Sequence, residues 1–416
     1  MQTSSRVRSL KPSTTLAVTA RAKELRESGV DVVSFAAGEP DFITPKPIID
    51  AAKKALDQGL THYGPVPGDL ETRRLLAHKL ENVNNIPNIT PDHVVVSSGG
   101  KHSLYQLFQT LIDPPAQGEQ PQEVIVPTPA WVSYMPQIEL AGGRVVQLRT
   151  DAAHDFKLTP TMLNDAITRR TRCVLINSPS NPCGTMYTPN ELKMLGEVID
   201  NAARTVAPDI TVISDELYEH IVYGGIPHFS IGSMESIAER TITVNGLSKA
   251  YAMTGWRIGY FAGSGEFGLQ VAAGVKKLQS QSTTSIPTFL MPPIRTALTE
   301  CAADVERMCA AFAERAAMMF DRISAIDGIV CPRPTGAFYL FPDLSAHFGK
   351  KTPKGAKIDS ALSFATALLD EAHVAVVPGE DFGSGGENCV RLTFACADET
   401  ITDGCERIAA FIESLS

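Results

Sequence analysis

One lysine in this chain is followed at short range by an arginine, in a context that suits a phosphorylated aldehyde. Lys249 comes after the apolar run 241–244, which is typical of a buried strand, and Arg257 lies eight residues later. A lysine held at a strand end, away from water, has a lowered pKa and can act as a neutral amine nucleophile. Because such an amine forms a Schiff base with an aldehyde and an arginine suits a phosphate, the pair points to pyridoxal phosphate (PLP).

A carboxylate and a tyrosine follow a second apolar run. Asp215 comes directly after residues 210–214, and Tyr218 lies three residues further on. A carboxylate at the end of a buried strand can cap the helix that follows, which is one interpretation. It can instead pair with a pyridinium nitrogen and keep it protonated, which makes the ring an electron sink. In that case Tyr218 would point at the phenolate oxygen of the ring.

Two glycines and a lysine stand between an expected strand and an expected helix. Gly99, Gly100 and Lys101 follow residues 93–97, and a helical pattern begins near His102. Glycines let backbone N–H groups approach an anion, and a helix N-terminus adds a favourable dipole. The segment is therefore either a phosphate site or an ordinary tight turn.

Three further residues have both a functional and a structural interpretation. Asn181 lies in a turn cluster, and it could stabilise that turn or donate a hydrogen bond to the phenolate. Trp131, one of two tryptophans, could pack in the core or stack on a planar cofactor. Arg391 interrupts the apolar strand 389–394, although arginine is seldom buried without an anionic partner. It could form a structural ion pair or hold a substrate carboxylate through two parallel hydrogen bonds.

Short apolar runs alternate with helical patterns between residues 92 and 265. The expected strands are residues 93–97, 123–126, 144–148, 172–177, 210–214, 241–244 and 258–262. Several are apolar without interruption, as expected of strands covered on both faces. An intervening helix is marked by Thr188 as N-cap, by Pro189 and by an apolar face of Leu192, Leu195 and Ile199. These patterns predict an α/β fold with a mostly parallel seven-stranded sheet and helices on both sides.

The chemically interesting residues each follow a different expected strand: Gly99, Asn181, Asp215 and Lys249. In a parallel sheet, ligands collect at the carboxyl ends of the strands. We therefore expect these residues to lie together in one site.

The chain is long enough for two domains, since it has 416 residues. After residue 300 the pattern changes to a helix-rich stretch, 301–326, then a few strands and a final helix, 398–415. We expect a large PLP-binding domain at 47–300 and a smaller α+β domain at 301–416. The segment 1–46 is expected to pack with the small domain.

Composition is that of a soluble globular protein, with 44% hydrophobic and 20% charged residues. The formal charge of −9 provides no basic footprint, so neither nucleic acid nor an anionic membrane is expected as the main partner. No apolar stretch approaches membrane-spanning length.

Cysteine usage and the N-terminus bear on location. The eight cysteines have no C-x-x-C or zinc-ligand spacing, which favours a reducing cytoplasm and no metal site. Residues 1–23 are basic and rich in Ser and Thr, as in a transit peptide. However, residues 10–13 lead into a helical pattern that ends near Gly29, so we expect mature structure there.

Taken together, the motifs resemble those of the class I PLP-dependent aminotransferases, and most closely the bacterial aspartate aminotransferase branch, subgroup Iβ. The resemblance runs from about Arg6 to Ile412. In order along the chain, the matching pieces are residues 37–41, 61–64, 98–101, 131–134, 177–182, 214–218, 248–249, 254–257 and 390–391. It implies PLP-dependent transferase fold type I.

The resemblance implies three catalytic residues. Lys249 matches the lysine that forms the Schiff base with PLP and then shuttles the substrate proton. Asp215 matches the partner of the pyridinium nitrogen, and Tyr218, with Asn181, matches residues that hydrogen-bond the phenolate. Trp131 matches the ring that stacks on PLP. The positions matching the phosphate site and its surroundings are Gly99, Gly100, Lys101, Ser248 and Arg257.

It also implies how substrate and a second subunit contribute. The α-carboxylate site is matched by Gly38 and Arg391, with Asn181 and Trp131 close to the substrate. Tyr63 matches a tyrosine that reaches the phosphate from the neighbouring subunit, which implies a homodimer with shared active sites.

Two positions depart from the patterns of related enzymes. Many relatives have a serine three residues before the lysine, whereas this chain has Gly246, and only Ser248 could supply a hydroxyl. The arginine that reads the distal carboxylate in subgroup Iα has no counterpart in the neutral stretch 279–285. In subgroup Iβ that role falls to a lysine after the Gly-Gly turn, which is Lys101 here.

The expected activity is therefore transfer of the amino group of L-aspartate to 2-oxoglutarate by a ping-pong mechanism. The nearest alternative is a prephenate or aromatic aminotransferase, because Thr15 and Lys101 match a pair found in relatives that accept prephenate. A PLP-dependent C–S lyase is a further alternative. A PLP-sensing transcription factor would need a DNA-binding domain, for which this chain has neither room nor a basic segment.

Overall fold

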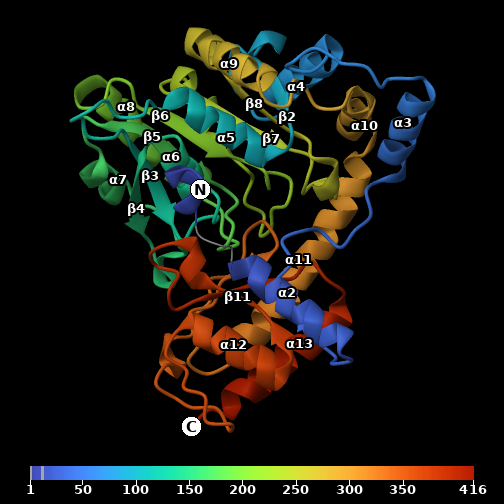
Figure 1. Cartoon of the computed structure of the whole chain (residues 1–416), viewed down its shortest axis with the longest axis vertical. Helices are drawn as coiled ribbons and strands as arrows, with labels where there is room; N and C mark the ends of the chain where they lie inside the picture. The colour runs from blue at the N-terminus through green and yellow to red at the C-terminus, as the bar shows by residue number, and fades with distance from the viewer. Residues whose placement is uncertain (1, 11–13) are drawn as a thin grey trace.

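The computed structural model describes residues 2–10 and 14–416, and it is built around a seven-stranded sheet (Figure 1). The strands are β2 (Val95–Ser97), β3 (Glu123–Thr128), β4 (Arg144–Arg149), β5 (Thr171–Asn177), β6 (Thr211–Asp215), β7 (Thr241–Gly246) and β8 (Gly259–Gly263). Their order is β2-β8-β7-β6-β5-β3-β4, and only β8 runs antiparallel to its neighbours within this sheet. The mostly parallel α/β sheet predicted from the apolar runs is confirmed.

Two element boundaries differ from the prediction near the first strand. The strand begins at Val95 rather than His93, because residues 91–93 form a 3₁₀ turn in which the His93 ring accepts the N–H of Thr90. Helix α5 (Gly100–Leu111) begins before His102, since Gly99, with φ of 87°, makes the turn and serves as its N-cap. The positive φ is easily adopted only by glycine.

Helices cover both faces of the sheet. Alternate residues of a strand point to opposite faces, so an uninterrupted apolar strand has apolar side chains to bury on both. Val124 and Val126 pack with α5, α6 (Tyr134–Leu140) and α9 (Gly265–Ser280). Ile125, between them, packs on the other side with α7 (Pro160–Ala166) and α8 (Pro189–Thr205). The sheet is therefore buried, and its carboxyl edge is the part left to build a site.

Helix α8 begins where the sequence predicted. Thr188 and Glu191 form a reciprocal capping box, and Pro189 occupies the first turn. The predicted apolar face of Leu192, Leu195 and Ile199 is buried. Local sequence alone explains this element.

The C-terminal part is a second group of elements, drawn below the large sheet in Figure 1. A three-stranded antiparallel sheet has the order β11 (Val377–Pro378), β12 (Val390–Thr393) and β9 (Tyr339–Leu340). It shares an apolar core with α11 (Ala302–Ser324), α12 (Ala361–Ala372) and α13 (Asp398–Glu413). The N-terminal region joins it, since β1 (Val33–Ser34) pairs with β10 (Val374–Ala375). The domain limits 1–46, 47–300 and 301–416 stay a prediction.

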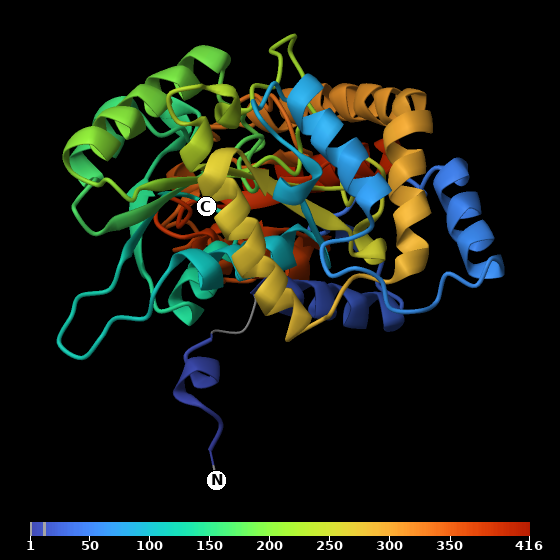
Figure 2. The ribbon, with the colours of Figure 1, turned by 90° about the horizontal axis from the view of Figure 1, so that it is seen from above.

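The remaining helices lie at the periphery. Helix α3 (Lys46–Asp57) runs beside α10 (Met291–Glu300), which also contacts α4 (Leu70–Asn82) (Figures 1 and 2). At the N-terminus, α1 (Ser5–Arg8) has no buried residue and stands clear of the main body in Figure 2, whereas α2 (Thr14–Glu27) contacts β10 and β11. Of the residues predicted to lead into α2, 11–13 lie outside the described residues. No helix in the described ranges is long and apolar enough to cross a membrane.

Candidate active site

The predicted site residues meet where the carboxyl edge of the large sheet faces the three-stranded sheet. Gly99, Asn181 and Lys249 follow β2, β5 and β7, as predicted, and Asp215 is the last residue of β6, one position earlier than expected relative to the strand end. Arg391 reaches them from β12, and its guanidinium donates to Asn181 Oδ1 at 3.1 Å. The site is thus a junction between two sheets rather than a property of one.

Lys249 is the reactive amine of this junction. Its ammonium donates to the carbonyl of Gly38, and Nζ lies 5.8 Å from the ring centroid of Tyr218 and 5.6 Å from that of Phe338. Burial, followed by the nearby positive charge of Arg391, lowers the pKa of Lys249 to about 8. This change makes the neutral amine accessible near neutral pH, as a Schiff-base nucleophile and proton carrier requires.

Asp215 lies fully enclosed at the end of β6. Its Oδ2 accepts a hydrogen bond of 2.6 Å from the Tyr134 hydroxyl, and Oδ1 accepts the N–H of Leu217 at 3.2 Å. The second bond lies in a turn, and the helix-capping role considered from the sequence is not found, because the next helical element after β6 in the described chain is the short 3₁₀ turn Ile231–Ser233. Burial raises the pKa of this carboxyl, while the hydrogen bonds and Lys249 oppose the rise. Within the described ranges no basic side chain forms an ion pair with it, so a cationic ligand nitrogen would be a favourable partner.

Arg391 is the second charged group that is buried without a counter-ion. Besides Asn181, it donates to the carbonyl of Ala36 at 3.0 Å, and its guanidinium lies 4.7 Å from the ring centroid of Tyr339. The side chain is 5% exposed, Nε has no hydrogen-bond partner, and no carboxylate of the described chain pairs with it. A buried charge is costly unless it is paired. Arg391 is therefore prepared to bind an anion, which is what a substrate carboxylate supplies.

A phosphate-sized cradle lies at the start of α5. A Cβ atom added to Gly99 would stand 2.5 Å from Arg257 Nη2, so the glycine makes room for the guanidinium. Gly100 opens the helix, whose N-terminal N–H groups and dipole favour an anion. Arg257 is held by its bond to the carbonyl of Thr254, at 2.8 Å. Backbone donors and a guanidinium at one turn fit the phosphate of PLP.

The glycine that replaces the usual serine has a steric explanation. A Cβ atom at Gly246 would lie 2.9 Å from the carbonyl oxygen of Ile258 and 3.0 Å from Leu217 Cδ1. A serine would thus need the neighbouring strand or Leu217 to move. Ser248, the predicted substitute, is buried at 6% exposure.

Lys101 and Trp131 form the side of the site nearest α5. Lys101 Nζ lies 5.0 Å over the ring of Trp131, which meets Tyr134 edge-on at 5.3 Å between centroids. Burial and the charge of Arg257 lower the pKa of Lys101. No acidic residue in the described part of the chain forms an ion pair with Lys101. Its charge is free to bind a carboxylate.

Two residues predicted for the site are not brought to it by the described chain. Tyr63 is 92% exposed, so it does not pack against Lys249 or Arg257. Thr15 lies in α2, and its side chain is outside the described residues.

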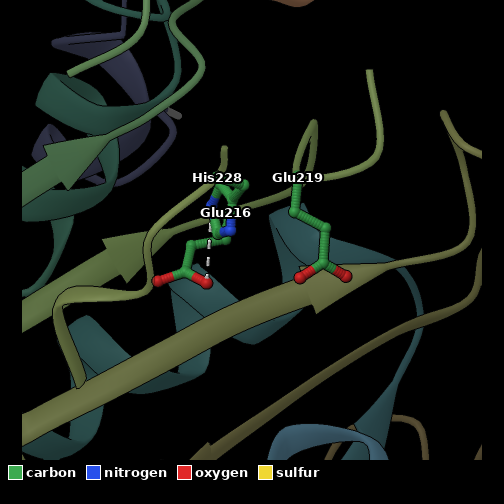
Figure 3. A group of neighbouring side chains, drawn as sticks. All are labelled: Glu216, Glu219 and His228. Carbon is green, nitrogen blue, oxygen red and sulfur yellow. Dashed lines mark ion pairs between the residues drawn. The ribbon is translucent and has the colours of Figure 1, made fainter. Parts of the chain in front are cut away.

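A charged cluster that the sequence did not indicate is formed by His228 and by Glu216 and Glu219, the chain neighbours of Asp215 and Tyr218 (Figure 3). Ligand atoms of Glu216, Glu219 and His228 all lie within 4.8 Å of one another, and Figure 3 shows the His228 ring beside Glu216. Three side chains at this spacing are able to hold a metal ion. However, the Lys79 ammonium donates to Glu219, and Asn84 donates to both carboxylates, so the protein itself offsets the charge. The cluster ties α4 to the segment that carries Asp215 and Tyr218.

The sequence analysis did not identify two tyrosines of the site. Tyr134 belongs to a motif of the resemblance, but nothing local assigns its hydroxyl to Asp215, which lies 81 residues away. Tyr339 is 121 residues from Tyr218, yet the two hydroxyls are 3.0 Å apart. The only local signal was an aromatic residue in an apolar strand, which is equally typical of a core.

This fold and this set of residues define a class of enzymes. The chain matches the model of the family described as aminotransferase class I and II over residues 30–408, and it belongs to that family. These enzymes are transaminases that act on amino acids and oxo acids.

Its relatives narrow the class to the bacterial aspartate aminotransferase branch. The chain is 41% identical to an aspartate aminotransferase of Bacillus subtilis, covering 100% of both chains. It is also 41% identical to an aspartate/prephenate aminotransferase of Cereibacter sphaeroides, over 98% of each. The crystal structure of the aspartate aminotransferase from Rhizobium meliloti superposes with a TM-score of 0.92 at 35% identity, with 100% of both chains covered.

Proposed function

We propose that this protein transfers the amino group of L-aspartate to 2-oxoglutarate, with PLP as cofactor, by a ping-pong mechanism. The observation that carries the proposal is that two unusual side chains lie in one site. Lys249 has its pKa lowered to about 8, and Arg391 is a buried cation without a carboxylate partner among the described residues. A reactive amine and a prepared carboxylate site are what an amino acid needs. The names of the full-length relatives support aspartate as the substrate.

Each part of PLP would meet a complementary group in the site. Gly99, Gly100 and Arg257 would hold the phosphate, and Asp215 would hold the pyridinium nitrogen. The remaining residues around the ring would be Trp131 on its face and Tyr218 and Asn181 at its phenolate oxygen, with Ser248 and the Lys101 backbone near the phosphate. When bound, PLP supplies an electron sink for the carbon that loses its proton.

Lys249 would carry the proton. As a neutral amine it would accept a proton from the substrate α-carbon and deliver it again. A base works best when its pKa lies near the working pH, and a value of about 8 meets that condition. The buried position of Lys249 also excludes water from this transfer.

The two carboxylates of aspartate would bind to two different cations. Arg391 would take the α-carboxylate, in the space that Gly38 leaves open: an added Cβ there would lie 3.8 Å from Arg391 Nη2. Lys101 would take the distal carboxylate as a compact charge, less selective in geometry than an arginine.

A second subunit would complete the site. Because Tyr63 is fully exposed in the single chain and matches a phosphate-binding tyrosine of the family, we assign it to the neighbouring active site of a homodimer. The cytoplasmic location stays a prediction from cysteine usage.

Prephenate is the second candidate acceptor. Relatives named aspartate/prephenate aminotransferase match at 41% identity over 98% of this chain. Steady-state kcat/KM with prephenate against oxaloacetate would decide between the two.

A single-turnover experiment tests the main proposal. The purified PLP form is mixed with L-aspartate alone, and the absorption spectrum and the oxaloacetate released are followed. We expect loss of the PLP band, growth of the pyridoxamine band and one oxaloacetate per site. A PLP band that persists with aspartate would reject this substrate while leaving the cofactor assignment intact.

A further inference from the structure

Tyr339 lies in the site, but the amino-transfer scheme above assigns it no role. Its hydroxyl lies 3.0 Å from that of Tyr218, and both side chains are buried. Tyr218 belongs to the segment after β6, whereas Tyr339 belongs to β9, where it pairs with Thr393 of the strand that carries Arg391. The hydrogen bond therefore joins the two halves of the site at the residue assigned to the phenolate.

The position of Tyr339 is fixed by close packing. Its ring lies 4.7 Å from that of Phe338, and the Arg391 guanidinium is 4.7 Å from its centroid. Its backbone carbonyl approaches Gly184 so closely that an added Cβ would be 2.0 Å away. Gly184, with φ of 70°, ends the turn that holds Asn181. The hydroxyl is thus held firmly relative to both Tyr218 and Asn181.

Both phenols of the pair are neutral in the working range. Burial raises the pKa of Tyr218 well above its usual value and Tyr339 raises it further, while Arg391 opposes the rise. Burial also raises the pKa of Tyr339, and the Arg391 cation opposes that rise too. Each phenol therefore keeps one proton to donate. Because Tyr218 is assigned to donate its proton to the phenolate, its oxygen is left to accept, and Tyr339 is the donor of the pair.

We propose that Tyr339 is a positioning residue for Tyr218: its hydroxyl donates to Tyr218 Oη and so directs the Tyr218 proton at the phenolate oxygen of bound PLP. Donation by Tyr339 polarises Tyr218 and strengthens the next hydrogen bond in the chain. The ionised phenolate is favoured as a result. This inference rests on the proposed PLP site.

The test is a spectroscopic pH titration of the PLP-loaded enzyme without substrate. In Tyr339→Phe we expect the apparent pKa of the cofactor absorption band to rise by about half a unit to one unit, as expected for one weakened hydrogen bond. If Tyr339 acts through Tyr218, adding Tyr339→Phe to Tyr218→Phe will produce no further rise. An unchanged or lowered pKa in Tyr339→Phe, or an equal rise in both backgrounds, would overturn the proposal.

Two further proteins separate this role from general loosening. Tyr223→Phe removes another buried hydroxyl, which donates to the carbonyl of Ala337, and should leave the titration unchanged. Replacement of Tyr339 by 3-fluorotyrosine keeps its shape but makes the hydroxyl more acidic, so the apparent pKa should fall. This variant also serves if Tyr339→Phe does not fold. Failure of the wild-type chain to form any PLP band would reject the proposed function instead.

Discussion

Lys249, Asp215 and Arg391 share one physical property, which is burial that their own chain leaves incompletely compensated. Lys249 has its pKa lowered, Asp215 has its pKa raised, and Arg391 lacks a carboxylate partner among the described residues. Each would be costly as a purely structural feature. A ligand with an aldehyde would compensate Lys249, and a basic ring nitrogen on the same ligand would compensate Asp215. The carboxylate of a substrate bound beside it would compensate Arg391. The three buried groups are thus complementary to such a ligand.

The lowered pKa of Lys249 predicts how PLP loading depends on pH. With a pKa of about 8, about one tenth of Lys249 is neutral at pH 7, against well under a thousandth of an ordinary lysine. The rate of PLP incorporation into cofactor-free protein should rise through pH 8 and level off above about pH 9. Absorbance growth measured from pH 7 to 10 checks this. A rate that keeps rising up to pH 10 would mean that the pKa of Lys249 is that of an ordinary lysine. Lys249→Ala, which lacks the reacting amine, is the control for absorbance changes that do not come from this residue.

The geometry of Arg391 predicts the effect of a conservative change. Arg391→Lys keeps the charge but loses the planar fork that binds a carboxylate through two bonds. KM for L-aspartate should rise about 10- to 100-fold, the equivalent of one lost charged hydrogen bond. Arg172→Lys is the matched control, because Arg172 lies at the amino end of β5 and bonds Leu111 and Thr211. Equal KM values in the two variants would contradict the assignment.

At the scale of elements, the site depends on how the segment after β6 is held. The backbone turns there from Asp215 to Tyr218. Glu216 and Glu219 of the same segment belong to the charged cluster, and Lys79 of α4 donates to Glu219. Burial works to raise the pKa of Glu219, but the charges of Lys79 and His220 outweigh it and hold that pKa well below its usual range. One helix distant in sequence thus anchors the strand end.

Removal of the Lys79 charge should destabilise the fold. Lys79→Met leaves Glu219 buried without its partner, at a cost of about 3–5 kcal/mol in the free energy of unfolding. Because the folded pKa of Glu219 is lowered, this contribution is present at neutral pH and is lost as pH falls through that lowered value. Urea denaturation at pH 7 measures it. Lys46→Met, which breaks an exposed pair with Asp50, should change little, and a similar loss in both would refute the anchor.

At the scale of the whole molecule, the site is assembled between two sheets and, as we propose, between two subunits. Tyr218 and Asn181 come from the large sheet, Tyr339 and Arg391 from the small one. Tyr63 remains exposed at the surface of the single chain. A closed symmetric dimer places the same patch of one subunit against its partner, so one tyrosine can serve the neighbouring site.

Mixed dimers test this arrangement. Lys249→Ala should be inactive, and Tyr63→Ala should bind PLP poorly. Co-refolding or co-expression of the two variants would produce heterodimers with one intact site, made of Lys249 from one chain and Tyr63 from the other. Random pairing should restore about one quarter of the wild-type sites. Activity no greater than the sum of the two parent variants would exclude shared sites.

The sequence by itself determined the elements and the ends of strands at which the chemistry lies. The buried strands are largely continuous apolar runs, and Gly99, Asn181, Asp215 and Lys249 lie at or shortly after their carboxyl ends, so their common edge could be predicted. The capping box of α8 is likewise a local signal. These features depend on neighbours within a few residues, which a single sequence displays.

Only the tertiary structure decided which side chains meet across the chain. The antiparallel direction of β8, the hydrogen bonds of Tyr134 and Tyr339, and the anchoring of Glu219 by Lys79 join residues tens to hundreds of positions apart. An apolar run has the same pattern in either direction, and an aromatic residue in a strand looks like core until its hydroxyl finds a partner. Contacts of this kind depend on the packing of whole elements, which local periodicity does not encode.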